Sequence, residues 1–549
     1  MKQKQEMVKN ISTIQGMDNN IGLHLTPSQQ RAYNLFLQGH NLFITGRGGS
    51  GKSYLTRYMI DSTISSGRSV IVCAPTGIAA INVHGATIHR TFQAPVRIIK
   101  PHEYLNIADI SEDVWKKLDK KGRKNQEKLD VIRKADVVII DEISMCRLDL
   151  FGYVSRTLLN YQGKTKQVVV VGDFYQLPPV LSNDKGETRA WQLIPEYADK
   201  VFAFQAPEWK QLDIMTIELT ENMRQTDKDF ISALDDIREG IPNFTPFGCR
   251  QSPHSKAVTL CPNNRMATSE NERHLNQLVR KGAKSQLFRE STTGILRKME
   301  DEALEKYRMT GKQVEICIGA RVIILVNDKD GAYVNGNMGE VTGLSEASIQ
   351  VKLDNGKLTT LGLYTWSVQE YQMVDKVNKE TGEKEKVSSL VEIGSIKQIP
   401  VKLAWAISVH KSQGQTYDYC NIKCGFWTEG QMYVALSRCR SLDGLRILGE
   451  LSEKELMYSE EVKEFMHRTL DTKLNNVTTN KESSISTIKH ERTLKNPKGA
   501  GRTPISDRSA VRNNLMRLTQ SEKMFVELLR NSEGFKNQVS EEYTRWINK

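Results

Sequence analysis

One short segment restricts the fold of this chain more than any other. Residues 46–53 read Gly-Arg-Gly-Gly-Ser-Gly-Lys-Ser and follow the apolar residues 42–44. Glycine, four residues, then Gly-Lys-Ser is the phosphate-loop pattern, in which backbone N–H groups and the positive end of the next helix surround phosphate. Lys52 would reach the outer phosphates and Ser53 would ligate magnesium. The segment predicts a nucleoside triphosphate site, and the preceding strand disfavours the alternative of a flexible surface loop.

Apolar runs alternate with helical patterns in the first part of the chain. Continuous apolar strands of this kind are typical of a parallel sheet that is buried on both faces. In open sheets of this class, ligands bind in the loops at the carboxyl ends of the strands. We therefore predict an α/β fold with its functional residues in those loops. The apolar runs are 42–45, 70–74, 137–140 and 168–171.

Two carboxylates, Asp141 and Glu142, directly follow the strand predicted at 137–140. Asp141 is placed for a magnesium shell, and Glu142 could orient or deprotonate an attacking water. An Asp-Glu pair by itself is more often a surface dipeptide than a site. Its position after an apolar strand, downstream of a phosphate loop, predicts a nucleoside triphosphatase.

A third loop, residues 172–180, follows the strand at 168–171. The amide of Gln176 could sense the terminal phosphate, while the prolines at 178 and 179 stiffen the loop. A simple proline turn is the alternative reading of this segment. Farther along the chain, Arg224 and Arg438 could form a charge clamp, because a guanidinium donated across a domain cleft stabilises phosphoryl charge only when the domains close. Either arginine alone could equally be a member of a surface ion pair.

The second half predicts another α/β region, with strands at 322–325 and 401–406. Between them, residues 339–398 contain short alternating strands and turns, which predict a small β-barrel, with 375–386 as an exposed hairpin tip or loop. A charged, helix-like stretch at about 92–128 interrupts the first region as an insertion.

Composition excludes several classes of protein. The chain has 549 residues, enough for about two to four domains, and no run of 18 apolar residues. Its first residues lack the apolar core of a signal peptide, so we expect an intracellular protein without a membrane partner. The net charge of +12 favours a polyanionic partner.

In this order, the motifs resemble those of superfamily 1 helicases of the B branch, the PIF/RecD-like group, and most of all PIF-type DNA helicases. A shorter stretch after Asp141 and Glu142 than in eukaryotic members favours a bacterial or bacteriophage member and argues against telomere work. Four further segments carry the resemblance: 25–29, 74–80, 85–89 and 406–416.

The resemblance implies two RecA-like P-loop domains that hold ATP and magnesium between them. It implies a 5′-to-3′ helicase that acts on single-stranded and forked DNA in replication, recombination or repair. We expect a monomer as the active unit, in the bacterial or phage-infected cytoplasm. The DNA path would include Thr76, His89, His410 and Ser412, and Ser53 and Asp141 would hold Mg²⁺. The catalytic residues would be Lys52, Glu142, Gln176, Arg224 and Arg438. The nucleotide-binding residues would be Gln29, which contacts adenine, Gly46, Gly48, Gly49, Ser50, Gly51, Lys52, Ser53 and Gly414.

The implied layout has a first RecA-like domain with an inserted wedge subdomain and a second with an inserted SH3-like β-barrel. A basic stretch, residues 481–520, has a net charge of +6 and reads as a solvated linker that could add DNA affinity. A capping-box pattern at 519–522 then predicts a small helical element, which faintly resembles a ribbon-helix-helix module; a partner-binding helix is the alternative. The predicted boundaries are 1–20 for a flexible N-terminus, 21–215 with the wedge at 92–128, 216–450 with the barrel at 339–398, 451–514 for the linker and 515–549 for the last element.

Three other functions fit part of the pattern. A DNA-stimulated translocase could remodel protein–DNA complexes without processive unwinding. A phosphate-loop kinase or metabolic nucleotidase would show ATPase activity that single-stranded DNA does not alter. A DNA-binding protein could use the nucleotide as a switch only, although Glu142 and Gln176 argue for hydrolysis.

Overall fold

The computed structural model describes residues 25–181, 185–248, 252–254, 257–305, 307–328, 331–377 and 384–470. These all belong to the first of two compact units, residues 1–474. The predicted N-terminal segment 1–20, the basic stretch 481–520 and the predicted element 515–549 lie outside the described residues.

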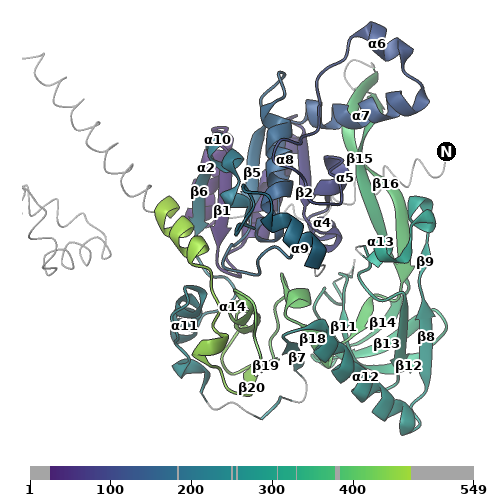
Figure 1. The fold of residues 1–549 in the computed structure, drawn as a ribbon. Helices are drawn as coiled ribbons and strands as arrows, with labels where there is room; N and C mark the ends of the chain where they lie inside the picture. The colour runs from purple at the N-terminus through teal and green to yellow at the C-terminus, as the bar shows by residue number, and fades with distance from the viewer. Residues whose placement is uncertain are drawn as a thin grey trace, which may run out of the picture. The chain divides into compact units, whose positions relative to one another are not determined.

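A six-stranded, wholly parallel sheet forms the first domain (Figure 1). The last strand pairs with the phosphate-loop strand, so the first domain extends to residue 219 and not to the predicted boundary at 215. In order across the sheet, the strands are β3 (Ala86–Thr87), β2 (Val70–Ala74), β4 (Val137–Ile140), β5 (Gln167–Val171), β1 (Leu42–Gly46) and β6 (Met215–Leu219).

Alternation along the strands explains why both faces of this sheet are apolar. Leu42 and Ile44 of β1 pack on one side with α2 (Pro27–Leu37) and α3 (Lys52–Ser65). Phe43, between them, packs on the opposite side with α8 (Leu148–Leu159) and α10 (Pro207–Gln211). The predicted α/β fold with a doubly covered parallel sheet is confirmed.

The second domain is built on a smaller parallel sheet of four strands. The sequence prediction found only part of it, the strand near 406. In order, its strands are β18 (Ala406–Ser408), β7 (Val258–Cys261), β19 (Cys420–Lys423) and β20 (Leu445–Leu448), and its helices are α11 (Lys228–Arg238), α12 (Asn264–Arg280) and α14 (Gln431–Leu436).

The two strands predicted for this domain at 322–325 and 401–406 mostly belong elsewhere. β11 (Arg321–Ile324) pairs antiparallel with β17 (Val401–Leu403), and not with the parallel sheet. Short apolar runs do not reveal whether their partner is parallel, which explains the error. Both belong to a five-stranded antiparallel sheet with β12 (Met338–Leu344), β13 (Ser348–Leu353) and β14 (Leu358–Gly362).

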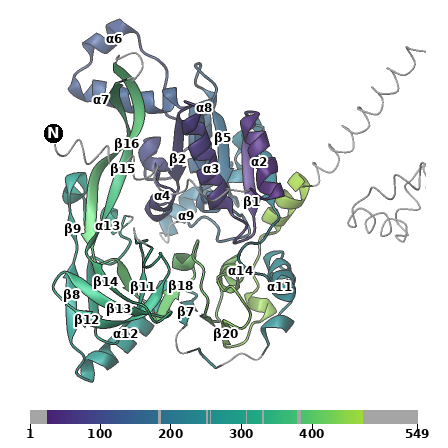
Figure 2. The ribbon, with the colours of Figure 1, turned by 180° about the vertical axis from the view of Figure 1, so that it is seen from behind.

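A long hairpin within residues 339–398 leaves this antiparallel sheet and reaches the first domain (Figure 2). It consists of β15 (Tyr364–Val377) and β16 (Lys384–Gln398), whose last paired residues, 375–377 and 384–386, agree with the hairpin tip predicted at 375–386. The other β elements are the two-residue β9 (Ser291–Thr292), which pairs with β16, and the antiparallel pair of β8 (Ser285–Arg289) and β10 (Gln313–Cys317).

The insertion predicted at 92–128 is helical in its second half. Its two helices, α6 (Glu112–Lys117) and α7 (Lys120–Lys134), are separated by Leu118 and Asp119. Asp119 caps α7 by accepting from Gly122 N. The insertion therefore continues to residue 134. Figure 1 shows both helices beside the far end of β15 and β16.

The range 451–514, predicted as a polar linker, begins with folded structure. Residues 460–470 are helical, and Val462, Phe465 and Met466 are buried in the core of the first domain. The Phe465 ring stacks on Phe204, with ring centroids 4.1 Å apart. The prediction failed here because only one side of the helix is apolar, within an otherwise polar stretch.

The remaining helices are short. None of the helices in the described ranges combines the length and hydrophobicity that a membrane span requires. The remaining short helices are α4 (Gly77–Asn82), α5 (Ile88–Thr91), α9 (Lys185–Gln192), α13 (Asp301–Glu305) and the 3₁₀-helices at Ile143–Met145, Ala203–Gln205, Thr245–Phe247, Gly294–Lys298, His410–Ser412 and Glu453–Glu455.

Candidate active site

Loops from the carboxyl ends of three neighbouring strands meet around one cavity of about 320 Å³. β1 leads into the phosphate loop, β4 into Asp141 and Glu142, and β5 into the loop of Gln176. This is the edge at which parallel sheets bind ligands. The structure therefore brings these predicted residues together.

Three glycines of the phosphate loop are required by its shape. Gly46, Gly49 and Gly51 have φ angles of 145°, 93° and 81°, a region that L side chains rarely adopt. A Cβ atom on Gly49 would lie 2.4 Å from Cβ of Arg224. A Cβ atom on Gly51 would lie 2.4 Å from Nε2 of Gln29. Both Arg224 and Gln29, which are far from the loop in sequence, therefore lie against it.

Lys52, Asp141 and Glu142 line the cavity together, and Asp141 is buried while the other two are half-buried. Nζ of Lys52 donates to the carbonyls of Gly46 at 2.7 Å and Arg47 at 3.0 Å. Burial lowers the pKa of Lys52, although Asp173 and Glu142 act in the opposite direction. Burial and the adjacent Glu142 raise the pKa of Asp141 to about 7.

Glu142 has an uncommon backbone conformation. Its φ is 52° and its ψ is 46°, a left-handed conformation that is uncommon for residues other than glycine. Burial raises the pKa of its carboxylate, while Lys52 and Arg438 lower it. A general base works best when its pKa is shifted towards the operating pH, and this environment raises it in that direction.

Two arginines reach the phosphate loop. A Cβ atom on Gly48 would lie 3.0 Å from Nη1 of Arg224 and 3.5 Å from Nη2 of Arg438. Arg438 follows Ser437, the C-cap of α14 in the second domain, whereas Arg224 lies in the segment that joins the two domains after β6. Burial and then Arg438 lower the pKa of Arg224 to about 9. Burial lowers the pKa of Arg438 as well.

The surroundings of these two guanidinium groups favour a bound anion. Arg224 donates to the carbonyl of Ser437 at 2.9 Å, and Nε of Arg438 donates to the carbonyl of Val434 at 2.9 Å. Within the described ranges, neither arginine forms an ion pair with a carboxylate. Two desolvated cations beside a glycine loop are suited to phosphate oxygens.

Comparison with known proteins agrees with this geometry. Residues 24–245 match the PIF1-like helicase family. The crystal structure of Bacteroides sp Pif1 in complex with ADP-AlF4 is 31% identical, covers 82% of this chain and 98% of its own, and superposes with a TM-score of 0.67. The chain belongs to the PIF1-like helicase family.

Two further family members are similar over most of their length. Bacteroides Pif1 bound to ssDNA is 31% identical over 82% of this chain and 98% of its own, with a TM-score of 0.55. The ATP-dependent DNA helicase Pif1 of Campylobacter jejuni is 29% identical over 434 residues, which are 74% of this chain and 88% of the relative. The resemblance to PIF-type helicases, stated from the motifs, is confirmed.

The other residues predicted to bind nucleotide or magnesium line the same cavity or contact the phosphate loop beside it. Gln29 is fully buried, and its Nε2 donates to the carbonyl of Ser50 at 3.4 Å. Gly414 lines the cavity with a φ of 77°. Ser53 and Asp141 also line it and offer the hydroxyl and carboxylate oxygens that Mg²⁺ prefers. No group of three His, Cys, Asp or Glu side chains in the described ranges could hold a metal, so further ligands would come from phosphate and water.

Sequence reasoning missed a buried charged network behind Gln176. Nε2 of Gln176 donates to Asp173 at 3.3 Å, and Asp173 forms an ion pair with Arg238 of α11 at 3.0 Å. The Arg238 guanidinium lies 4.2 Å from the centre of the Tyr175 ring. Asp173 lies in the loop 172–180, which the sequence analysis had already singled out. No sequence pattern marked Arg238, because an arginine in the last turn of a helix is common.

Two further residues of the second domain were missed. Nε2 of Gln413 donates to the Glu142 carboxylate at 3.2 Å. Gly48 N donates to the Tyr433 hydroxyl at 3.2 Å. Gln413 lies within the segment 406–416 that carries the family resemblance, so its polar side chain just before Gly414 could have been predicted as a site residue. Tyr433 lies in an apolar helix, and no sequence feature marked it as a site residue.

The predicted DNA residues are divided between the two domains. Thr76 precedes α4 and accepts from Ala79 N at 3.2 Å, while His89 lies half-buried in α5. His410 is half-buried in the second domain, and burial lowers its pKa. Ser412 lies in the same 3₁₀-helix as His410. Its side chain is fully buried, and its hydroxyl donates to the carbonyl of Val409 at 2.7 Å, which closes the turn.

Proposed function

We propose that this chain is an ATP-dependent DNA helicase that moves 5′ to 3′ along single-stranded DNA and unwinds duplexes in replication, recombination or repair. The observation that carries the proposal is the position of Arg438, which follows a helix of the second domain yet lies against the phosphate loop of the first. A nucleotide bound there would be touched from both domains. Hydrolysis of the nucleotide would therefore change the contacts between the two domains.

The residues at the cavity have distinct proposed tasks. Lys52 would leave the carbonyls of Gly46 and Arg47 for the outer phosphates. Glu142 would accept a proton from the attacking water, and Gln176 would contact the terminal phosphate. Arg224 and Arg438 would stabilise the charge that develops on the transferred phosphoryl group. Mg²⁺, held by Ser53 and Asp141 together with the nucleotide, would supply further neutralisation of phosphate charge.

Loops of both domains would couple ATP hydrolysis to the binding of DNA. Thr76 and His89 in the first domain and His410 in the second are the proposed contacts with the strand. We propose the insertion that contains α6 and α7 as the strand-separating wedge and residues 339–398 as the SH3-like module. Separating a base pair costs about 1.4 kcal/mol in stacking, so the energy from ATP hydrolysis is sufficient. Unwinding therefore depends on how hydrolysis is coupled to movement of the domains.

Several features of the relatives support DNA as the partner. Bacteroides Pif1 is bound to ssDNA in a structure that resembles this chain, and the Campylobacter relative is named an ATP-dependent DNA helicase. The net charge of +12 is in keeping with a polyanionic partner. We expect the active unit to be a monomer, because both arginines that reach the phosphate loop come from the same chain.

Strand displacement on tailed duplexes tests the proposal. With ATP and Mg²⁺, we expect release of the labelled strand from a duplex with a 5′ single-stranded tail and little release from one with a 3′ tail. Lys52→Ala serves as the inactive control. Release from the 3′-tailed substrate alone would reverse the polarity. ATPase activity that single-stranded DNA stimulates, with no displacement from either substrate, would favour the translocase that remodels protein–DNA complexes.

A further inference from the structure

A single carboxylate of the long hairpin lies between two cations of the first domain. Oε2 of Glu370 on β15 is 3.1 Å from Nε of Arg90 on α5, and its Oε1 is 2.6 Å from Nζ of Lys128 on α7. The Glu370 side chain is only 8% exposed, whereas those of Arg90 and Lys128 are 18% and 36% exposed. One negative charge thus faces two positive charges, which leaves a net positive site.

The hairpin that carries Glu370 is docked on the first domain at neighbouring points. The hydroxyl of Tyr371 accepts from Val72 N at 2.8 Å. Near the far end of the hairpin, Nζ of Lys386 donates to Glu127 of α7 at 3.0 Å. These contacts fix the position of Glu370 against α5 and α7.

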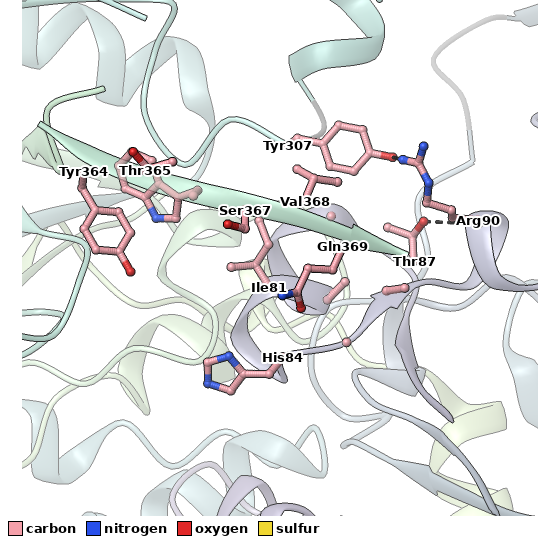
Figure 3. A pocket seen from close by; sticks show the side chains of 15 residues that line it. Ile81, His84, Thr87, Arg90, Tyr307, Tyr364, Thr365, Ser367, Val368 and Gln369 are labelled. Atoms are coloured by element: carbon pink, nitrogen blue, oxygen red, sulfur yellow. Dashed lines mark hydrogen bonds between the residues drawn. The ribbon is translucent and has the colours of Figure 1, made fainter. Parts of the chain in front are cut away.

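A cavity of about 200 Å³ opens beside this site (Figure 3). Its walls come from α4, β3 and α5 of the first domain and from β15, and they include Thr87, Arg90 and Gln369. In Figure 3 the Arg90 side chain extends from α5 to the Tyr307 hydroxyl, to which its Nη1 donates at 3.3 Å. The guanidinium is therefore at the edge of a cavity and is held by groups on two sides.

We propose that Arg90 and Lys128 bind a backbone phosphate of the DNA strand, and that Glu370 occupies the place of this phosphate in the DNA-free protein. The proposal rests on the proposed function, since it names part of the DNA site. A carboxylate and a phosphate present similar oxygen pairs to a guanidinium, so one can replace the other. Arg90 also directly follows His89, a residue of the proposed DNA path.

The exchange has a physical consequence. DNA that enters the site must displace Glu370 from both cations, so part of the binding free energy offsets the lost ion pairs. Removing the negative charge of Glu370 would therefore strengthen DNA binding. Removing either cation would weaken it. The effect of Glu370 on DNA affinity should also vanish when both cations are absent, because the carboxylate and the phosphate then have no shared binding site.

Fluorescence anisotropy with a labelled oligo(dT) strand tests this inference on the full chain. We expect Glu370→Gln to lower the Kd by roughly three- to tenfold. Glu392→Gln is the matched control, because Glu392 is an exposed carboxylate on the adjacent strand β16 that accepts from Ser367, and we expect it to leave the Kd unchanged. Arg90→Gln should raise the Kd and reduce the slope of log K against log salt by about 0.7, the value for one phosphate contact on a single strand.

A double-mutant cycle makes the test decisive. Adding Glu370→Gln to Arg90→Gln/Lys128→Gln should give no gain in affinity. A gain of equal size in both backgrounds, or an equal gain from Glu392→Gln, would show a general charge effect and overturn the inference. An unchanged Kd in Glu370→Gln would do the same. If Glu370→Gln fails to fold in thermal melting, Lys128→Gln decides, because the half-buried side chain of Lys128 is the more exposed of the two cations and the inference requires weaker binding.

The outcomes separate this inference from the proposed function. Wild-type protein that binds oligo(dT) and unwinds 5′-tailed duplex, but whose variants all bind alike, would contradict only the role of Glu370. Wild-type protein that binds no DNA would contradict the proposed function itself.

Discussion

The side chain of Gln413, from the second domain, donates to the carboxylate of Glu142, in the first domain, at 3.2 Å. The hydrogen bond links the proposed general base to the loop that follows β18. That loop also holds Arg438, whose Nη1 donates to the carbonyls of Ser412 at 3.5 Å and Gln415 at 3.4 Å. One loop of the second domain therefore contacts both the base and the arginine.

Gln413→Ala is expected to slow ATP hydrolysis about tenfold while leaving ATP affinity near that of the wild type. The lost hydrogen bond to a charged group is worth roughly 1.5–3 kcal/mol, part of which would be lost from the positioning of Glu142. Turnover assays and nucleotide titration measure the two effects separately. Gln415→Ala is the local control, since the side chain of Gln415 bonds to Tyr417 instead. Equal losses in both variants would place the effect in the loop and not in the contact with Glu142.

Glu142→Gln is expected to bind ATP and hydrolyse it slowly, with a loss of about 10²- to 10⁴-fold in the hydrolysis step. The amide keeps the shape of the side chain but cannot accept the proton. Rapid-quench single-turnover kinetics measure the step directly. Loss of nucleotide binding in this variant would assign Glu142 to the metal site or to the structure of the loop.

Arg238→Met is expected to destabilise the protein by about 3–5 kcal/mol, because it leaves the fully buried Asp173 without its ion-pair partner. Adding Asp173→Asn should restore a large part of the loss, since the amide carries no charge. Chemical denaturation measures both variants against Arg280→Met, a change at an exposed position at the end of α12. A loss that Asp173→Asn does not reduce would show that Arg238 acts through packing on Tyr175.

Phe465→Ala is expected to cost about 3–5 kcal/mol of stability, a typical value for deleting a buried aromatic ring. Phe465 is 4% exposed and lies against Phe204, Trp209 and Phe174 of the first domain. Thermal melting compares it with Met457→Ala, which changes a side chain that is 42% exposed. A melting temperature near that of the wild type would mean that residues 460–470 contribute little to the first domain.

The parts of the site that were predicted share a local signal. Gly46 to Ser53, Asp141 and Gln176 each follow an apolar strand, and the carboxyl ends of parallel strands meet at one edge. Local pattern therefore predicted both the first sheet and the residues that its loops bring together. Arg224 and Arg438 were predicted as a charge clamp with a surface ion pair as the alternative, and their placement at Gly48 needed the structure.

The parts that were missed depend on contacts between distant segments. β11 and β17 have the composition of buried strands, but only their partners reveal that they are antiparallel. Arg238 is an unremarkable cation at a helix end until the fold places it on Asp173. The burial of Ser412 likewise follows from the turn that closes on Val409, which no motif discloses.

Arg438→Ala tests most directly whether the second domain completes the ATP site. We compare steady-state ATP turnover in the presence of single-stranded DNA with nucleotide affinity from titration, and use Arg446→Ala, on β20 and outside the cavity, as the control. We predict a fall in turnover of about 10³-fold or more with near-normal affinity, as for other arginines that act in trans on phosphoryl groups. Turnover within a few fold of the wild type would contradict it.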